Sequence, residues 1–313
     1  YDNSYHINNR VQLEGTTLMT EISVHADRRL AIIDLYLAFT GQVQRSDLIH
    51  HFDIGTATAS RSLKKYRSQY PDNIDYSVSD RAYISSPGFS PAYQHETDAA
   101  LRLIAFGQET TQINSPRYGI SSPVTLTASI DLHSAQTITS AIVSGALVSM
   151  AYSSSSSGNR ERMVAPHAIF ESGGTWYFRC HDLDNRDFRT FRFSRVKSAK
   201  AVDASMHKPS LGPTDDREWL SVITLTVGPH PNRENQDALR KDLGLVDKPV
   251  KNIQVNEAMA GFVLIDLRVD CSKDGNLNPH EYYLRLLNRH ELVSVGSLAI
   301  APGFSEHKKY LND

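Results

Sequence analysis

The chain has 313 residues, with 33 Lys and Arg against 35 Asp and Glu, and a formal net charge of −2. Hydrophobic residues make up 40% and charged residues 22%, a composition that excludes a collagen-like or disordered chain. At roughly 100–200 residues per domain, this length predicts two or three domains. No segment approaches the roughly 20 apolar residues of a membrane span, so we expect no membrane partner. Near-neutral charge counts against bulk attraction to nucleic acid, but an average over the chain hides local patches.

The two cysteines, Cys180 and Cys271, are far apart in sequence, too few for a disulfide framework or a Cys-rich zinc site. We expect free thiols and a reducing cytoplasm. Residues 1–24 are polar and aperiodic, and they lack the basic and then apolar pattern of a signal peptide. We interpret them as an N-terminal extension, with Met19 as a candidate start of the compact chain.

Three helices are predicted after this extension. Residues 28–39 carry apolar side chains at helical spacing and end at Gly41. A second helix is predicted over 44–52, with its N-cap at Ser46 or just before it. A third runs over 56–70, which Thr56 is expected to cap and Pro71 to stop.

A β-hairpin follows the third helix. Residues 74–78 and 82–84 read as its strands, and Asp80 and Arg81 lie in its turn. Three helices with a tight turn before the third, and then a hairpin, are typical of a winged helix-turn-helix, predicted here over 25–90.

The third helix predicts DNA binding because it is basic and contains no acid. Its first turn holds small and hydroxylated residues, which can approach base edges or donate to phosphates, and its later basic residues suit flanking phosphates. An ordinary solvated basic helix is the alternative, which the ordered trio of helices and the hairpin disfavour. The candidate DNA-binding residues are Arg45, Ser46, Thr56, Thr58, Ser60, Arg61, Lys64, Lys65 and Arg81.

Residues 91–124 are interpreted as a linker that contains a helix over 97–107. A second domain is predicted over 125–205, with a helix over 134–142 followed by strands. We expect Ser153–Gly158 to be a hairpin loop, and the whole to be a strongly bent antiparallel sheet of the kind that closes into a barrel. The predicted strands are 147–152, 162–170, 175–181 and 188–193.

Two motifs in this sheet resemble the WYL domain, an Sm-like β-barrel named for a Trp-Tyr-Leu triplet. The first is Gly173–Phe178, GGTWYF, in which Phe178 replaces the Leu of the triplet. The second is Asp187–Val196, DFRTFRFSRV. The order of winged helix, linker helix, WYL barrel and C-terminal extension resembles that of WYL transcriptional regulators. The third helix is most similar to that of the BrxR and CapW type, repressors associated with bacterial anti-phage defence operons.

The resemblance implies an effector site for a nucleotide or nucleic-acid fragment in the barrel. Strand alternation agrees, because it sets Tyr177, Arg179 and His181 on one face and Trp176, Phe178 and Cys180 on the other. Guanidinium groups beside aromatic rings suit phosphates and bases. The alternative is that the arginines pair with acids and that the histidine is structural. The candidate ligand-binding residues are Tyr152, His167, Tyr177, Arg179, Arg189 and Arg192.

The C-terminal segment, 206–313, is predicted to be a small α/β domain, and the resemblance implies that it mediates dimerisation. We predict strands at 219–227, 251–255 and 261–269 and helices at 235–243 and 279–288. Residues 270–281 also match the ligand spacing of an EF-hand calcium loop. A strand predicted before this loop, where an EF-hand has a helix, favours a capped turn instead, with Asn278 and Glu281 as its capping box.

The sequence therefore predicts an α+β multidomain protein: a winged helix-turn-helix, a central Sm-like barrel and a C-terminal dimerisation domain. We expect a homodimeric regulator, a repressor rather than an enzyme, that binds an inverted-repeat operator in double-stranded DNA. No catalytic motif, metal site or cofactor is predicted. A nucleic-acid-processing enzyme that uses the barrel, and a calcium-responsive module, are the alternatives.

Overall fold

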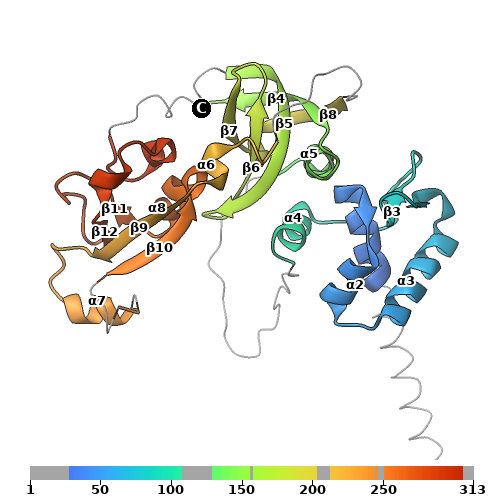
Figure 1. The fold of residues 1–313 in the computed structure, drawn as a ribbon, viewed down its shortest axis with the longest axis horizontal. Helices are drawn as coiled ribbons and strands as arrows, with labels where there is room; N and C mark the ends of the chain where they lie inside the picture. The colour runs from blue at the N-terminus through green and yellow to red at the C-terminus, as the bar shows by residue number, and fades with distance from the viewer. Residues whose placement is uncertain are drawn as a thin grey trace, which may run out of the picture. The chain divides into compact units, whose positions relative to one another are not determined.

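The computed structural model describes residues 28–107, 129–155, 158–202, 212–242, 244–245 and 250–305 (Figure 1). The predicted extension over 1–24 lies outside these residues, as does the part of the predicted linker from 108. The described residues form two compact units. The first holds 28–107 and 135–144, and the second holds 129–134 and the described residues from 145 onward.

The first unit contains the three predicted helices. The first helix covers 28–40 and is followed by Gly41 at a φ of 74°, the left-handed conformation expected after a helix. Helix α2 spans Arg45–Phe52 and α3 spans Thr56–Gln69. Between them Asp53 has a φ of 48°, so the predicted tight turn is confirmed.

The predicted cap of α3 is wrong by one residue. The N-cap is Gly55, whose carbonyl oxygen accepts from the backbone N–H groups of Thr58 and Ala59, and Thr56 is already helical. The N-cap of α2 is Gln44, the residue just before Arg45, and its backbone N–H donates to Asp47 Oδ2 at 2.6 Å.

The hairpin forms as predicted, with β2 (Ile74–Ser77) paired antiparallel to β3 (Ala82–Ser85) and Arg81 in the turn at a φ of 52°. A short strand between the first two helices, β1 (Gln42–Val43), adds to the free edge of β3. The sequence did not reveal β1, because two residues are too few to show a strand period.

A buried carboxylate joins α3 to the first helix of this unit. Asp34 is 0% exposed and accepts from the Tyr66 hydroxyl and, at 2.7 Å, from His95 Nε2. The backbone N–H groups of Ala92 and Tyr93 donate to the same carboxylate. Burial, followed by the hydrogen bond to Asp34, raises the pKa of Tyr66 well above its usual range, so the hydroxyl stays a donor. These hydrogen bonds fix the rotation of α3 about its own axis relative to the first helix.

Two further helices complete the first unit. Helix α4 (Thr97–Phe106) ends at Gly107, as predicted. Helix α5 (Leu132–Ser144) belongs to this unit from Ala135 on. Its Thr139 Oγ1 donates to the carbonyl oxygen of Phe39 at 2.5 Å, so α5 satisfies the end of the first helix.

The second unit begins with a bent antiparallel sheet of five strands in the order β7-β6-β5-β4-β8. A 3-10 turn over Phe193–Arg195 joins β7 to β8. Within the described residues no ladder pairs β7 with β8, so hydrogen bonds do not close the sheet into a complete barrel. The strands are β4 (Leu147–Ser154), β5 (Gly158–Ser172), β6 (Thr175–Asp182), β7 (Asp187–Arg192) and β8 (Val196–Val202).

The two faces of β6 carry the residue sets that alternation predicts. One, here the Phe178 face, holds Trp176, Phe178 and Cys180, all of them buried core. The Tyr177 face holds Tyr177, Arg179 and His181, which are also buried, at 7%, 5% and 9% exposed. Their cross-strand partners on β7 are Arg192, Thr190 and Phe188 respectively, so the Tyr177 face continues onto that strand.

The C-terminal part of this unit is a mixed sheet in the order β10-β9-β12-β11, in which β11 and β12 are parallel (Figure 1). A four-residue helix, α6, stands where the predicted first strand would start. Gly244, at a φ of 66°, follows α7 as predicted. The elements are α6 (Arg217–Leu220), β9 (Val222–Pro229), α7 (Gln236–Asp242), β10 (Lys251–Asn256), α8 (Ala260–Asp266), β11 (Val269–Asp270) and β12 (Leu284–Leu286).

Two predicted elements of this part are wrong. The strand predicted over 261–269 is mostly helix α8, because a short continuous apolar run fits a buried helix as well as a strand. The helix predicted over 279–288 is a turn followed by β12. Asn278 and Glu281 do contact each other, at 3.2 Å, but their hydrogen bond lies in a turn and caps no helix.

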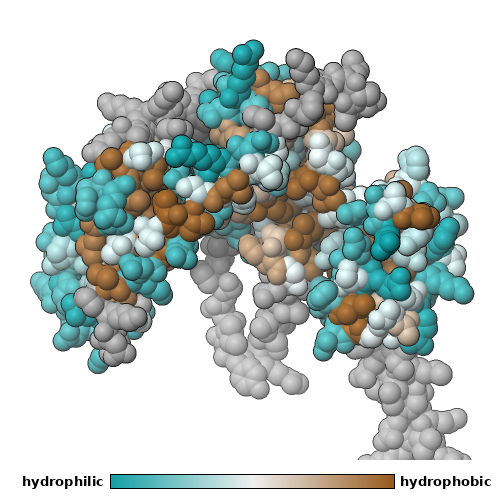
Figure 2. Space-filling model, viewed as in Figure 1, coloured by the Kyte–Doolittle hydropathy of each residue, from teal (hydrophilic) through white to brown (hydrophobic). Residues whose placement is uncertain are grey.

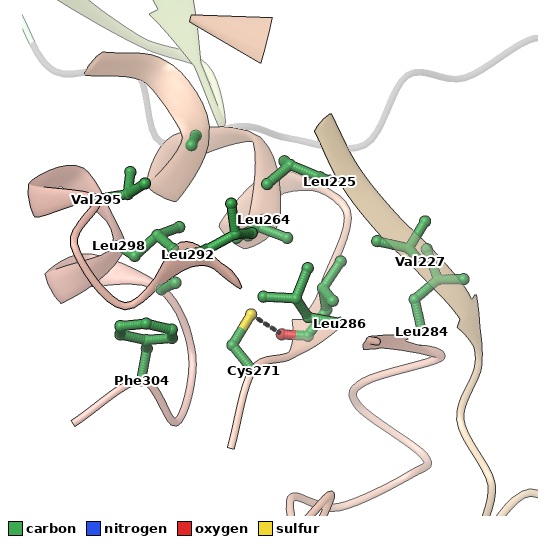
Figure 3. Packing of buried hydrophobic residues seen from close by; sticks show 13 residues of the cluster. Leu225, Val227, Leu264, Cys271, Leu284, Leu286, Leu292, Val295, Leu298 and Phe304 are labelled. Carbon is green, nitrogen blue, oxygen red and sulfur yellow. Dashed lines mark hydrogen bonds between the residues drawn. The ribbon is translucent and has the colours of Figure 1, made fainter. Parts of the chain in front are cut away.

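One hydrophobic core holds the C-terminal part together (Figure 3). Figure 3 shows Leu225 and Val227 on β9 and Leu264 on α8, with Leu298 and Phe304 lying across from β9. None of the described helices is long and apolar enough to span a bilayer.

We predict that Gly261→Ala destabilises this core. A Cβ at Gly261 would lie 2.0 Å from the backbone oxygen of Ser297 and 2.7 Å from Ile300 Cγ1, so the two segments must separate. We expect a loss of roughly 1–3 kcal/mol in the free energy of opening, more than the ~1 kcal/mol that Ala gains over Gly in a helix. Native-state hydrogen exchange at the amides of α8 measures it.

Gly212→Ala is the matched control, because a Cβ at Gly212 meets nothing within 4 Å. Equal opening free energies in the two variants would contradict the close packing of α8.

Candidate nucleic-acid interface and effector site

Helix α3 has one buried and one exposed face. Ala59, Ser62, Leu63 and Tyr66 are buried, at the spacing of one helical stripe. Arg29 Nε donates to Ser62 Oγ at 3.0 Å, so even the polar member of the stripe is satisfied. The opposite face is exposed and basic. The exposed side chains of α3 are Thr56, Ala57, Arg61, Lys64, Lys65, Arg67, Ser68 and Gln69.

The first turn of α3 is open to a ligand. No side chain in the described part of the chain caps it, and the first N–H groups of a helix have no partner within the helix, so they can donate to an anion. Arg61 Nη2 donates to Thr58 Oγ1 at 3.1 Å, which directs the guanidinium toward this turn. Thr58 and Ser60 are half-buried. The arrangement can place hydroxyl, amide and guanidinium donors on one anionic surface.

The remaining candidates of the first unit lie on other elements. Arg45 is exposed at the start of α2, and Ser46 is half-buried beside it. Arg81 is exposed in the hairpin turn. The turn also carries an acid, Asp80, which accepts from Ser77 Oγ at 2.5 Å. The basic character therefore belongs to α3 rather than to the hairpin.

In the second unit, Arg179 is held between two carboxylates. Its Nε donates to Asp216 Oδ2 at 2.7 Å and its Nη2 to Asp216 Oδ1 at 3.0 Å, a bidentate pair. The same Nη2 donates to Glu218 Oε2 at 2.8 Å. The Arg179 and Asp216 side chains are 6% and 1% exposed. Both acids lie on α6 or at its N-cap, outside the WYL-like sheet.

His167 and a group of aromatic rings surround this ion pair. His167 Nε2 lies 3.0 Å from Asp216 Oδ2. Its ring packs edge-to-face on Phe188 and on Trp219, each at 5.7 Å between centroids. The ring of Phe262 on α8 packs against that of Tyr177, with 4.9 Å between the ring centroids. The Tyr177 face is thus covered by α6 and α8 of the C-terminal part.

The charges around Asp216 make it a strong anion. Burial alone would raise the pKa of Asp216, but hydrogen bonds from His167 and Arg179, together with the charge of Arg179, hold it well below its ordinary value. The pKa of Arg179 is correspondingly raised, since its bonds to Asp216 and Glu218 outweigh its desolvation. Both groups are charged at neutral pH.

The structure brings four of the six predicted ligand residues together. His167, Tyr177, Arg179 and Arg192 belong to the Tyr177 face, and Arg192 Cζ lies 5.4 Å from the Tyr177 ring centroid. Arg189 is on the Phe178 face, where it pairs in register with Cys180.

Tyr152 is buried on the Phe178 face as well, with its ring centroid 4.8 Å from that of Phe191, and its hydroxyl oxygen accepts from the backbone N–H of Arg192 at 3.1 Å.

Two residues of this site, Asp216 and Glu218, were not predicted from the sequence. An Asp before a short helical segment signals an N-cap, but nothing in the sequence tells which cation it meets.

The described residues include no group of three or more His, Cys, Asp or Glu side chains placed to hold a metal ion. Helix α8 occupies most of the strand predicted before the segment 270–281, but the two-residue strand β11 still leads directly into it, so no entering helix adjoins the segment. Asp270, the first position, is 0% exposed and accepts from the backbone N–H groups of Ser272 and Leu277. The Arg285 guanidinium lies against Gly275 and donates to the carbonyl oxygen of Lys273, which places a cation beside the loop.

Three family models match the chain in order. The BrxR transcriptional regulator winged helix-turn-helix domain matches 25–105, and the WYL domain matches 133–201. The BrxR transcriptional regulator C-terminal dimerization domain matches 222–292.

Curated relatives of this chain are also named as transcriptional regulators. The DNA-binding transcriptional repressor CapW of Stenotrophomonas maltophilia is 28% identical over 261 residues, covering 78% of this chain and 83% of that protein. CapW of Pseudomonas aeruginosa is 26% identical over 280 residues, covering 86% and 91%. A solved structure, Proteasome accessory factor B/C of Arthrobacter aurescens, is 16% identical over 90% of this chain, with a TM-score of 0.22. The chain spans about half of that protein, 49%.

We predict that the acid sensitivity of the second unit depends on Asp216. Because its pKa is lower in the folded than in the unfolded chain, its stabilisation is complete above about pH 4 and is lost as the pH falls further, by up to ~1.4 kcal/mol per pH unit. Asp216→Asn should be less stable than wild type at pH 7, and the difference should shrink between pH 4 and pH 2.5. Thermal unfolding across this range measures it.

Asp215→Asn removes an exposed carboxylate next in sequence and is the control. Stability curves of wild type and Asp216→Asn that run parallel through pH 3 would contradict the assignment.

Proposed function

We propose that this chain, which belongs to the BrxR type of WYL-domain regulators, is a homodimeric, sequence-specific DNA-binding repressor without catalytic activity. The observation that carries the proposal is α3, whose buried stripe is fixed to the core while its opposite face is exposed and basic. Relatives named as DNA-binding transcriptional repressors support it. So do the family models for a winged helix and a dimerization domain.

In the proposed complex, the first half of α3 enters the major groove of double-stranded DNA. Its N-terminal residues reach base edges, and the later lysines contact phosphates. The hairpin contacts the neighbouring backbone through Arg81. We propose as contacts the residues that the sequence analysis singled out, namely Arg45, Ser46, Thr56, Thr58, Ser60, Arg61, Lys64, Lys65 and Arg81.

We propose the domain boundaries 25–90, 91–124, 125–205 and 206–313. The proposed dimer forms through the last of these domains. Apolar side chains are exposed there, and Figure 2 shows hydrophobic residues gathered over α6 and the adjoining sheet. Val222 is 61% exposed and Leu220 57%. Such side chains are candidates for burial against a second copy. Two-fold symmetry would match an inverted-repeat operator, and the family resemblance points to a phage-defence operon.

We further propose that a nucleotide or nucleic-acid effector binds at the Tyr177 face and modulates DNA binding. His167, Tyr177, Arg179 and Arg192 supply the cations and rings that such a ligand needs. Tyr152 and Arg189 would act from the Phe178 face, Tyr152 through its bond to the Arg192 backbone. An effector can regulate only if it binds the DNA-competent and incompetent states with different affinity.

We predict that Arg61→Ala weakens operator binding by about 10–100-fold, the range for loss of a good base contact. Selection of bound sequences from random DNA identifies the operator, and fluorescence anisotropy at fixed salt measures the affinity. Lys64→Ala should weaken all sequences about equally and lower the salt slope by roughly one.

Arg160→Ala is the control, since Arg160 is an exposed arginine on β5 of the second unit. Operator affinity in Arg61→Ala equal to that in Arg160→Ala would remove α3 as the reading helix.

We predict that sedimentation of the free chain gives about twice the chain mass of 35.0 kDa. Two winged helices on one particle are required to read both half-sites of an inverted repeat. A monomer that persists at micromolar concentration and also on the operator would refute the dimer.

A further inference from the structure

The carboxylate oxygens of Asp216 and Glu218 accept from Arg179 at the positions where the oxygens of a bound phosphate would accept. A guanidinium presents parallel N–H donors that fit a carboxylate and a phosphate alike. Here both donors on one edge of Arg179 are used by Asp216, and Nη2 is shared with Glu218. Because the guanidinium is 6% exposed, a ligand cannot reach it while α6 keeps this position.

The acids that occupy this position come from a short element rather than from the sheet. Helix α6 has four residues, and Asp216 caps it by accepting from the backbone N–H of Trp219 at 3.2 Å. A four-residue helix has little stability of its own. Its position therefore depends on the ion pairs and on Trp219, whose ring packs against His167 and Phe170.

Helix α6 is also hydrogen-bonded to the rest of the C-terminal part. Ser221 Oγ donates to Glu257 Oε1 at 3.0 Å, and the Glu257 backbone N–H donates to the Ser221 carbonyl oxygen at 2.9 Å. The side-chain amide of Asn256 donates to the carbonyl oxygen of Trp219. A displacement of α6 is thus transmitted to β10 and to the 3-10 turn over Glu257–Met259.

We infer that α6 is an internal competitor for the effector: a phosphate-bearing ligand takes Arg179 and His167 from Asp216 and releases α6. This inference rests on the proposed effector site at the Tyr177 face. The exchange replaces one anion by another at the same guanidinium, so Arg179 is never left buried and unpaired. Asp216 and Glu218 return to water, and the start of the C-terminal part loses its attachment to the sheet.

In such a competition, the release of α6 that the ligand causes also determines the affinity with which the ligand binds. The observed dissociation constant equals the intrinsic one divided by the fraction of molecules whose α6 is released. Weakening the internal anion should therefore tighten ligand binding. A merely structural ion pair predicts the opposite, because its loss would loosen the site.

The test measures binding of two phosphate-bearing probes to full-length variants: a fluorescein-labelled four-nucleotide single-stranded thymidine DNA, and ATP as its competitor. Asp216→Asn should bind the labelled DNA at least ten-fold more tightly than wild type. Glu218→Gln, which removes a partner that is 31% exposed, should bind more tightly by a smaller factor and is the second variant should Asp216→Asn fold poorly. Asp215→Asn should match wild type. Arg179→Gln should abolish the gain when combined with Glu218→Gln.

Hydrogen exchange gives a readout at α6 itself. The Leu220 and Ser221 backbone N–H groups donate to the carbonyl oxygens of Asp216 and Arg217. Saturating wild type with the labelled DNA should accelerate exchange at these two amides and leave the amides of β4 unchanged. Displacement by ATP would identify a free nucleotide as sufficient, and no displacement would assign the site to nucleic acid.

Three results would overturn the inference. The first is equal affinity of wild type, Glu218→Gln and Asp216→Asn for the labelled DNA. The second is unchanged exchange at α6 when wild type is saturated. The third is no binding of either probe to any variant. Operator binding without probe is measured in parallel, so a chain that fails to select an operator refutes the proposed repressor, whatever the probes show.

Discussion

A guanidinium that is 6% exposed requires a carboxylate, and in this chain Asp216 supplies it from 37 residues further along the sequence. An isolated charge at this depth would cost several kcal/mol, and breaking such a pair costs ~3–5 kcal/mol. On β6 itself, Arg179 is flanked on the same face by Tyr177 and His181, neither of which is a carboxylate. Burying the Tyr177 face and positioning α6 are therefore one event, and the C-terminal part is placed on the sheet by the same contacts.

This constraint puts two demands on one set of side chains. A ligand site needs cations and rings that a solute can reach, whereas a stable unit needs them paired and covered. Arg179 and His167 meet the second demand with Asp216, and Tyr177 does so with Phe262. The WYL-like triplet divides between the roles: Trp176 and Phe178 pack in the core, and only Tyr177 faces the contact with the C-terminal part. The proposed anion exchange at Arg179 would reconcile the two demands.

The sequence predicted most of the first unit and of the five-stranded sheet because their signals are local. The helical stripe of α3 and the alternation of β6 extend over enough residues to show a period. The errors lie where distant contacts decide. In helix α8 Gly261 lies close to the Ser297 backbone, and Leu284 and Leu286 pair with β9, contacts that the local pattern does not encode. The pairing of Arg179 with Asp216 has no local signal at all.

The same long-range pairing explains why a net charge of −2 does not describe the surface that meets DNA. Several acids are buried as partners of internal donors and cations: Asp34 with His95, Asp182 with Arg162, and Asp216 with Arg179. Buried pairs contribute little field outside the protein, and exposed charges more than about 10 Å apart are largely screened at 0.1 M salt. Helix α3 exposes Arg61, Lys64, Lys65 and Arg67, and its own sequence contains no acidic residue. A phosphate near that helix therefore encounters its four cations. The rest of the chain carries a formal net charge of −6, which keeps nonspecific attraction small, so that selectivity falls to base contacts and to the spacing of two winged helices.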